Sequence, residues 1–201
     1  MLAQCVAIEM VGAGDAGIRE AEGLAAWLDT AYAKCCEGGE LLQPAACALL
    51  TGPPAAGKTS LLSQVLMRSL DNAGAGLVPI LVRVQALQTR LLDNNDDAFA
   101  ASWNWVDALL RLQHGANSAL YRMLRQALLA RRALLLLDGL DEGGAVRERI
   151  ERHVAEVLAP QGHAILATSR PAGVTEALFT HFRRLALSPL TEAQQLQALE
   201  Q

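Results

Sequence analysis

Residues 52–59 carry the clearest chemical pattern in this sequence. They read Gly-Pro-Pro-Ala-Ala-Gly-Lys-Thr, a full match to the pattern GxxxxGK[ST]. Glycines permit a loop whose backbone N–H groups point inward, and a helix that starts after such a loop adds the positive end of its dipole. In this pattern the Lys58 ammonium binds the β- and γ-phosphates, and the Thr59 hydroxyl ligates Mg²⁺. The pattern therefore predicts a nucleoside triphosphate site.

An ordinary turn before a helix is the alternative interpretation of these residues. The chain has only two lysines, and its composition would produce the pattern by accident roughly once per thousand such sequences. We therefore assign nucleotide binding to the loop and the start of the next helix. The assigned residues are Gly52, Pro53, Pro54, Ala55, Ala56, Gly57, Lys58, Thr59 and Ser60.

A cluster of acidic residues follows an apolar run at residues 133–137. It reads Asp-Gly-Leu-Asp-Glu and ends at Glu142. A carboxylate at the carboxyl end of a parallel strand is where a P-loop enzyme holds Mg²⁺, so Asp138 is the candidate metal ligand. Asp141 and Glu142 are candidates for orienting or deprotonating an attacking water. The alternative is that these acidic residues only stabilise the start of the next helix.

A third polar cluster, Thr168-Ser169-Arg170, ends the apolar run at residues 164–167. If this strand lies between the other two, the three side chains face the γ-phosphate. Arg170 then donates charge-assisted hydrogen bonds to that phosphate and reports its presence. An arginine at a strand end is otherwise a solvated surface residue. The order of the three clusters favours the functional interpretation.

These clusters need strands that end side by side, and the hydrophobic pattern supplies them. Short apolar runs alternate with helical stretches, which is typical of a parallel sheet covered by helices. The expected strands are residues 46–50, 77–84, 133–137, 164–167 and 182–187, and the expected helices are residues 18–36, 58–71, 99–112, 118–131 and 145–158. Residues 1–17 show no period, and residues 93–97 form a polar loop. We predict an α/β P-loop NTPase fold with a five-stranded, mainly parallel sheet and helices on both faces.

Composition limits the remaining classes of protein. The 201 residues are 52% hydrophobic, which excludes a disordered chain, and the net charge of −4 argues against direct nucleic-acid binding. The N-terminus has no basic region and carries Glu9 in its apolar stretch, so it is a poor signal peptide. No apolar run approaches the roughly 18 residues of a membrane span. The cysteines form no CxxC pair and are interpreted as reduced thiols: Cys5, Cys35, Cys36 and Cys47. We expect a cytoplasmic protein.

The ordered series of motifs resembles the NACHT-type NTPase domain. The matching segments are GPPAAGKTS (52–60), LLLLDGLDE (134–142), ILATSRP (165–171) and LALSPLTEAQ (185–194), and the second strand VPILVRVQAL (78–87) also looks similar. The family belongs to the signal-transducing ATPases with numerous domains (STAND), among the AAA+-like P-loop proteins. The resemblance implies a sheet order 5-1-4-3-2, Asp138 as a Mg²⁺ ligand and Arg170 as the sensor. It also implies Asp141 and Glu142 as candidate water-activating residues.

We expect three segments. Residues 1–45 are a helical lead-in, residues 46–190 are the NACHT-type core, and residues 191–201 begin a truncated helical region. Because this last helix stops at the chain end, we expect a domain cut out of a longer protein, or a truncated one. Its partners would be nucleotide, together with flanking effector or sensor domains or further copies of itself.

The function that the resemblance implies is a nucleotide-controlled signalling and oligomerisation switch. It would bind ATP or ADP with Mg²⁺ and hydrolyse ATP slowly, because no arginine finger is evident. The candidates for that role are Arg131, Arg132, Arg183 and Arg184. A non-hydrolytic nucleotide-binding scaffold remains an alternative. A small-molecule or nucleoside kinase is a weaker one, since an arginine-rich lid and an acceptor pocket are not apparent.

Overall fold

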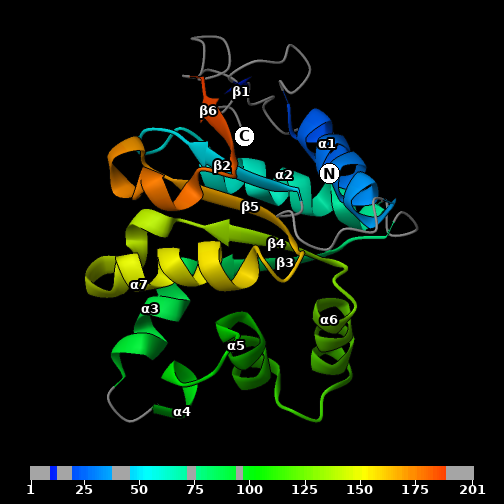
Figure 1. Cartoon of the computed structure of the whole chain (residues 1–201), viewed down its shortest axis with the longest axis vertical. Coiled ribbons are helices and arrows are strands. Elements are labelled where there is room, and N and C mark those ends of the chain that lie inside the picture. The colour runs from blue at the N-terminus through cyan, green and yellow to red at the C-terminus, as the bar shows by residue number, and fades with distance from the viewer. Residues whose placement is uncertain (1–9, 13–19, 38–45, 72–75, 94–96, 189–201) are drawn as a thin grey trace, which may run out of the picture.

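The centre of the protein is a six-stranded sheet in the order β1-β6-β2-β5-β4-β3 (Figure 1). The computed structural model describes residues 10–12, 20–37, 46–71, 76–93 and 97–188. The strands are β1 (Met10–Gly12), β2 (Cys47–Thr51), β3 (Val78–Arg83), β4 (Ala133–Asp138), β5 (Ala164–Ser169) and β6 (Arg183–Leu187). The five predicted strands follow the predicted order 5-1-4-3-2, which is confirmed.

Register brings the three chemical clusters to one edge of the sheet. β2, β5 and β4 are parallel neighbours, with Thr51 opposite Ser169 and Leu137 opposite Ala167. All three strands therefore end within a residue or two of each other. In Figure 1 this edge lies on the left, where the arrowheads of β2 and β4 point. The loops that follow these strands carry the residues assigned above.

Helices cover both faces of the sheet. The α-helices are α1 (Ala21–Glu37), α2 (Lys58–Asp71), α3 (Val84–Leu92), α4 (Asp97–Ala100), α5 (Trp105–His114), α6 (Ala119–Leu129) and α7 (Arg147–Arg152). The 3₁₀ helices η2 (Leu140–Val146), η4 (Pro171–Gly173) and η5 (Glu176–Phe179) follow strands β4 and β5, and the π-helix η3 (His153–Leu158) continues α7. α1 and α2 pack on one face, and α3, α5, α6 and α7 pack on the other.

The two apolar cores explain why the central strands lack alternation of polar and apolar residues. Leu135 and Leu137 of β4 face the core beneath α3 and α5, whereas Leu134 and Leu136 face the core beneath α1 and α2. All four are almost fully buried. A strand covered on both faces needs apolar residues at every position, so the leucine run forms a strand despite its helical propensity.

One helix was missing from the sequence prediction, and one predicted helix is two helices in the structure. The predicted strand at 77–84 ends at Arg83, and α3 begins directly at Val84. Arg83 makes no capping hydrogen bond through its side chain, so the usual sequence signal for a helix start is absent. The predicted helix at 99–112 is divided, because Asn104 caps α5 by accepting a hydrogen bond from the Asp107 N–H.

The N-terminal part of the chain adds an element that the sequence did not predict. β1 pairs antiparallel with β6 at the edge of the sheet, with Val11 opposite Ala186. The rest of the lead-in is outside the described residues, except for residues 20–37. The predicted C-terminal region at 191–201 also lies outside them. Among the described helices, none combines the length and apolarity that crossing a bilayer requires.

Candidate nucleotide site

The loop between β2 and α2 has the backbone geometry that its sequence predicts. Gly57 has φ +90°, and Ala55 adopts φ +59°, a conformation that L-residues with a side chain rarely take. The Gly52 N–H donates a hydrogen bond to the Ser169 carbonyl, which fixes the start of the loop to the end of β5. α2 then begins at Lys58, so its first N–H groups open onto the loop.

Lys58 folds back over the loop. Its ammonium donates hydrogen bonds of 2.8 Å to the carbonyls of Gly52 and Pro53. Partial burial lowers the pKa of this ammonium from its ordinary value, and the nearby Arg170 lowers it further. The carboxylates of Asp141, Asp138 and Glu142 act in the opposite direction. The lysine therefore lies within the electrostatic reach of the whole acidic cluster.

Thr59 and Asp138 meet at the end of the loop. The Thr59 hydroxyl lies 2.9 and 3.2 Å from the two carboxylate oxygens of Asp138. A hydroxyl and a carboxylate are hard oxygen donors, which suit Mg²⁺, and Mg²⁺ completes its octahedron with waters and phosphate oxygens. A protein site with few ligands is therefore chemically adequate for this metal. Within the described residues no group of three or more His, Cys, Asp or Glu side chains is arranged for a metal.

Thr168 holds Asp138 from the strand beside it. Its hydroxyl lies 3.1 Å from Oδ1 of Asp138 and accepts a hydrogen bond of 2.9 Å from the Gly139 N–H. Thr168 is fully buried. Gly139 has φ +78°, and a Cβ there would lie 3.0 Å from the Glu142 side chain. A glycine is therefore favoured at this turn by its backbone conformation, whereas the exposed Glu142 side chain could move away from a Cβ.

Asp141 and Glu142 differ in what they contact. Asp141 binds Arg170 twice: Oδ2 lies 2.9 Å from the guanidinium Nε, and Oδ1 accepts the Arg170 backbone N–H at 3.1 Å. Its side chain is 11% exposed, against 55% for Arg170. Glu142 is exposed, and its carboxylate makes no hydrogen bond or ion pair within the described residues. One carboxylate is committed to an arginine and the other is free.

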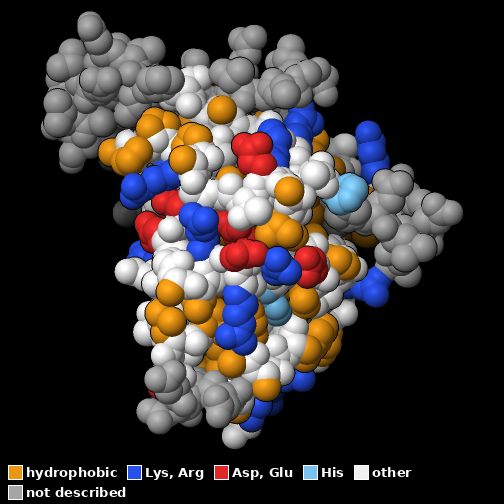
Figure 2. All heavy atoms as spheres, turned by 60° about the vertical axis from the view of Figure 1, so that its left-hand side comes forward, with side chains coloured by type: hydrophobic (Ala, Val, Ile, Leu, Met, Phe, Trp, Pro, Cys, Tyr) orange, Lys and Arg blue, Asp and Glu red, His pale blue; other side chains and the backbone are white. Residues whose placement is uncertain are grey.

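These residues line one cavity of about 340 Å³. Its walls are Pro54, Ala55, Ala56, Gly57, Lys58, Thr59, Ser60, Asp138, Gly139, Asp141, Glu142 and Arg170. Gly52 and Pro53 contribute their carbonyls to Lys58 and lie behind the lining. Figure 2 turns this edge of the molecule forward and shows acidic and basic side chains gathered there. The structure thus brings together the residues that the sequence assigned to the site.

Arg147 is a residue that the sequence interpretation did not include. It lines an adjoining open hollow of about 440 Å³ together with Asp141, Glu142 and Arg170. Its guanidinium Nε lies 3.6 Å from Oε1 of Glu151, a carboxylate that is fully buried. Its position in the sequence could have indicated that Arg147 lies near the site, because α7 starts at this residue, shortly after the acidic cluster.

The four arginines considered as fingers lie elsewhere. Arg131 follows α6, and Arg132 donates to the Gly76 carbonyl. Arg183 stacks over the Trp27 ring, and Arg184 donates to the Glu176 carbonyl. None of the four lines the candidate cavity.

Comparison with known protein families finds the NACHT domain, which matches residues 47–201. This match includes the loop, the acidic cluster and strand β5 with Arg170 after it, and it covers most of the chain. The chain belongs to the NACHT domain family. The NACHT domain is a nucleotide-binding NTPase module, and the fold is that of a P-loop NTPase. No curated protein matches the sequence significantly.

Two solved structures can be compared with this NACHT domain, and the likeness concerns the fold alone. ORC1 of Aeropyrum pernix, solved in complex with DNA, is 17% identical with a TM-score of 0.52. The match covers 89% of this chain and 49% of that one. PCH-2 of C. elegans is 15% identical with a TM-score of 0.47, covering 89% of this chain and 44% of that one. The chain therefore spans under half the length of either structure.

Proposed function

We propose that this NACHT domain is an ATP-binding, Mg²⁺-dependent NTPase that acts as a nucleotide-controlled switch with slow hydrolysis. The observation that carries the proposal is the convergence of Lys58, Asp138 and Arg170 on one cavity beside a helix N-terminus. Such a cavity offers backbone N–H groups and two cations to a polyphosphate, and a carboxylate to a divalent metal.

We assign nucleotide binding to the loop and to the first two residues of α2, Lys58 and Thr59. The N–H groups of the loop and the Lys58 ammonium bind the phosphates once Lys58 releases the two carbonyls that it now contacts. Thr59 and Asp138 would hold Mg²⁺, which supplies charge neutralisation at the phosphates. The preference for adenine is an inference from the family.

Hydrolysis would use the free carboxylate of the acidic pair. We assign Glu142 to orient the attacking water and accept its proton, because its carboxylate has no other partner in the described part of the chain. Asp141 is a positioning residue, since it already holds Arg170 through two hydrogen bonds. Arg170 is the group that senses the γ-phosphate, and its exchange between Asp141 and that phosphate would couple nucleotide state to the β5 loop.

A slow rate follows from the limited positive charge at the site. The cavity is lined by two cationic side chains, Lys58 and Arg170, and Arg170 begins paired with a carboxylate. Fast P-loop NTPases add an arginine that stabilises the transition state. We propose that a neighbouring subunit or a flanking domain contributes that charge, which would link hydrolysis to oligomerisation in the cytoplasm.

The non-hydrolytic scaffold remains the second candidate. The observation that favours it is the Asp141–Arg170 pair, which keeps the sensor away from a phosphate until the pair breaks. A kinase would need an acceptor pocket beside the phosphates, and the adjoining hollow is lined by two carboxylates and two arginines. That lining suits water better than a neutral alcohol.

The decisive experiment measures nucleotide binding and phosphate release by the purified chain with Mg²⁺-ATP and no acceptor. We expect Lys58→Ala to weaken binding by at least about tenfold. Glu142→Gln should keep binding and lower phosphate release by about a hundredfold. Lys34→Ala, on the exposed face of α1, and Glu148→Gln, exposed on α7, are the matched controls.

Each outcome separates the candidates. Saturable binding with slow release supports the switch. Binding without release in the wild type supports the scaffold instead. Transfer of phosphate to an added alcohol, in place of release, would support the kinase. Equal nucleotide binding by Lys58→Ala and Lys34→Ala would contradict the assignment of the loop itself.

A further inference from the structure

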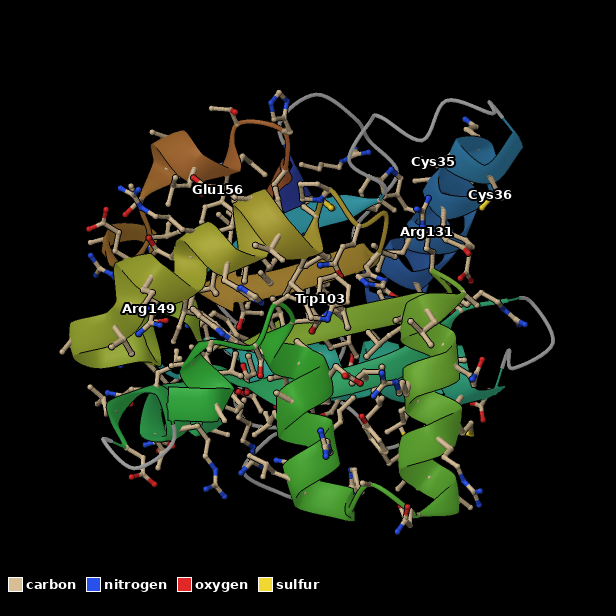
Figure 3. All side chains as sticks on the ribbon, turned by 60° about the horizontal axis from the view of Figure 1, so that its bottom comes forward. Cys35, Cys36, Trp103, Arg131, Arg149 and Glu156 are labelled. Atoms are coloured by element: carbon tan, nitrogen blue, oxygen red, sulfur yellow. The ribbon has the colours of Figure 1, made fainter. Side chains whose placement is uncertain are left out.

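A second cavity lies at the amino ends of the central strands, opposite the carboxyl ends that carry the nucleotide site. It has a volume of about 270 Å³ and is lined by Trp103, Asn104, Asp107, Arg125, Leu128, Leu129, Arg131, Gln161 and His163. Arg131 lies two residues before β4 and His163 directly precedes β5, so the cavity is at the amino ends of these strands. Figure 3 labels two of the lining residues, Trp103 above α5 and Arg131 beside the amino end of β4.

The floor of this cavity is a fixed polar network. The Asn104 side-chain N–H donates a hydrogen bond of 2.9 Å to Oε1 of Gln161, and Nε2 of His163 lies 3.2 Å from the same oxygen. Asn104 is 3% exposed and His163 is 1% exposed, so both are locked by their surroundings. Because Oε1 only accepts, His163 must donate from Nε2. The amide N–H₂ of Gln161 has no partner among the described residues and remains available to a ligand.

Arg131 is a cationic residue that lines the cavity. It adopts φ +58°, in the left-handed region, although it is not glycine. Its side chain runs along Gly162, where a Cβ would lie 3.6 Å from the arginine Cδ. Its guanidinium makes no hydrogen bond or ion pair within the described part of the chain. This conformation ends α6 in a Schellman motif, in which the N–H groups of Arg131 and Arg132 donate to the carbonyls of Leu128 and Ala127.

The cavity has an excess of positive charge. Arg125 lies 3.5 Å from the Asp107 carboxylate, so the charges of these two residues largely offset each other. Arg125 also donates a hydrogen bond of 2.8 Å to the Tyr121 hydroxyl. Burial, and then the nearby Arg131, lowers the pKa of His163 to about 4, and the ring is therefore neutral at pH 7. The charge that remains is that of Arg131, beside the free Gln161 amide.

An exposed aromatic ring completes the lining. Trp103 is 66% exposed, and Leu129 is 59% exposed, although both are large apolar residues. A tryptophan at the mouth of a cavity presents a flat apolar surface at little entropic cost, which is the usual way that proteins hold a planar group. Leu128 provides a buried apolar wall.

We propose that this cavity binds a small ligand that has a planar apolar body and one carboxylate. The Arg131 guanidinium and the Gln161 amide bind the carboxylate by charge-assisted hydrogen bonds. Trp103 and the two leucines contact the planar body. The volume is close to the lower limit for small-molecule sites, which restricts the ligand to one or two fused rings.

The test uses 2-naphthoate and its neutral isostere 2-naphthamide as probes, with the purified chain and no nucleotide. Binding is measured by calorimetry and by the shift of the Trp103 indole N–H signal, which Trp103→Phe assigns. We expect 2-naphthoate to bind at least about tenfold more tightly than 2-naphthamide. Arg131→Gln should remove this difference, and Arg122→Gln, exposed on α6, should keep it.

Arg131→Gly is the second variant, because glycine accepts φ +58° and the chain then keeps its backbone conformation. It should also lose the preference for the carboxylate. Three results would overturn the proposal. They are equal binding of the acid and the amide by the wild type, an unchanged preference for the acid in both Arg131 variants, and no binding of 2-naphthoate up to about 10 mM. Mg²⁺-ATP binding by Arg131→Gly should equal that of the wild type, so this result is independent of the proposed nucleotide function.

Discussion

At the scale of single residues, the partner of each polar side chain decides its chemical role. Asp141 and Glu142 are adjacent carboxylates on η2, yet one is bound to Arg170 and the other is free. Asp138 receives two threonine hydroxyls, one from the phosphate loop and one from β5. These contacts orient the carboxylate, and an oriented ligand lowers the free-energy cost of forming a metal site.

The buried hydroxyl of Thr168 provides the first prediction. Thr168→Val leaves the Gly139 N–H buried without an acceptor, so the free energy of unfolding should fall by about 1–3 kcal/mol. Mg²⁺-dependent nucleotide binding should also weaken, because Asp138 loses one of its two hydroxyl partners. Urea unfolding and calorimetry check both effects. Thr168→Ser keeps the hydroxyl and should resemble the wild type; equal losses in the two variants would mean that the methyl group matters instead.

At the scale of elements, short turns at the strand ends fix the acidic cluster. η4 follows β5 and lies against η2, with Gly173 in close contact with Asp141. A Cβ on Gly173 would clash with Cβ of Asp141. The glycine is therefore needed for close approach and not for an unusual backbone angle. The turn also holds Arg170 beside the carboxylate that binds it.

Gly173→Ala should therefore displace Asp141 and break its pair with Arg170. We expect a loss of about 1–3 kcal/mol in stability from overpacking and a change of about tenfold in phosphate release. Thermal unfolding and a phosphate-release assay measure the two effects. Ala172→Ser adds one heavy atom at the exposed neighbouring position and serves as the control. If Gly173→Ala matches the wild type in thermal unfolding and in the rate of phosphate release, the close contact of η4 with Asp141 does not contribute to stability or activity.

At the scale of the whole molecule, the central strands have one cavity at their amino ends and another at their carboxyl ends. Strands β4 and β5 begin beside the Arg131 cavity and end beside the nucleotide cavity. The helical layer on the α5 side also buries two neutral histidines. His153 stacks on Trp105, with ring centroids 4.0 Å apart, and accepts the Trp105 backbone N–H at 3.2 Å. His163 supports the polar floor described above.

These two histidines predict a loss of stability in mild acid. Burial lowers the pKa of each to about 4, and the nearby Arg149 and Arg131 contribute to the effect. Below pH 6.5 the unfolded chain takes up protons that the folded chain does not, so stability is complete above pH 6.5 and falls toward pH 4. The decrease is at most about 1.4 kcal/mol per pH unit for each histidine.

Urea unfolding at several values between pH 7 and pH 4 measures this slope. The double variant His153→Gln and His163→Gln should have a shallower slope over that range. Its stability at pH 7 then serves as the reference for the lost contacts. An identical slope in the wild type and the double variant would exclude the histidines as its cause and leave the carboxylates.

The sequence by itself located the five predicted strands, the phosphate loop and the candidate residues at the strand ends. These features depend on short-range spacing: GxxxxGK[ST] needs only a strand before it and a helix after it, and an apolar run needs only coverage on both faces. The strand order was expected only from the resemblance to the NACHT-type domain. α3 was missed because Arg83 gives no capping signal, although its buried residues Val84, Leu87 and Leu91 have helical spacing.

Only the tertiary structure decided which charges pair. Asp141 and Arg170 are 29 residues apart, and Thr168 meets Asp138 across 30 residues, so these contacts depend on the register of β4 against β5. The Arg131 cavity likewise combines α5, α6 and the start of β5, segments with no shared pattern in sequence. Spacing along a chain fixes local geometry, whereas the choice between two neighbouring carboxylates is made by whichever side chain the fold places beside each.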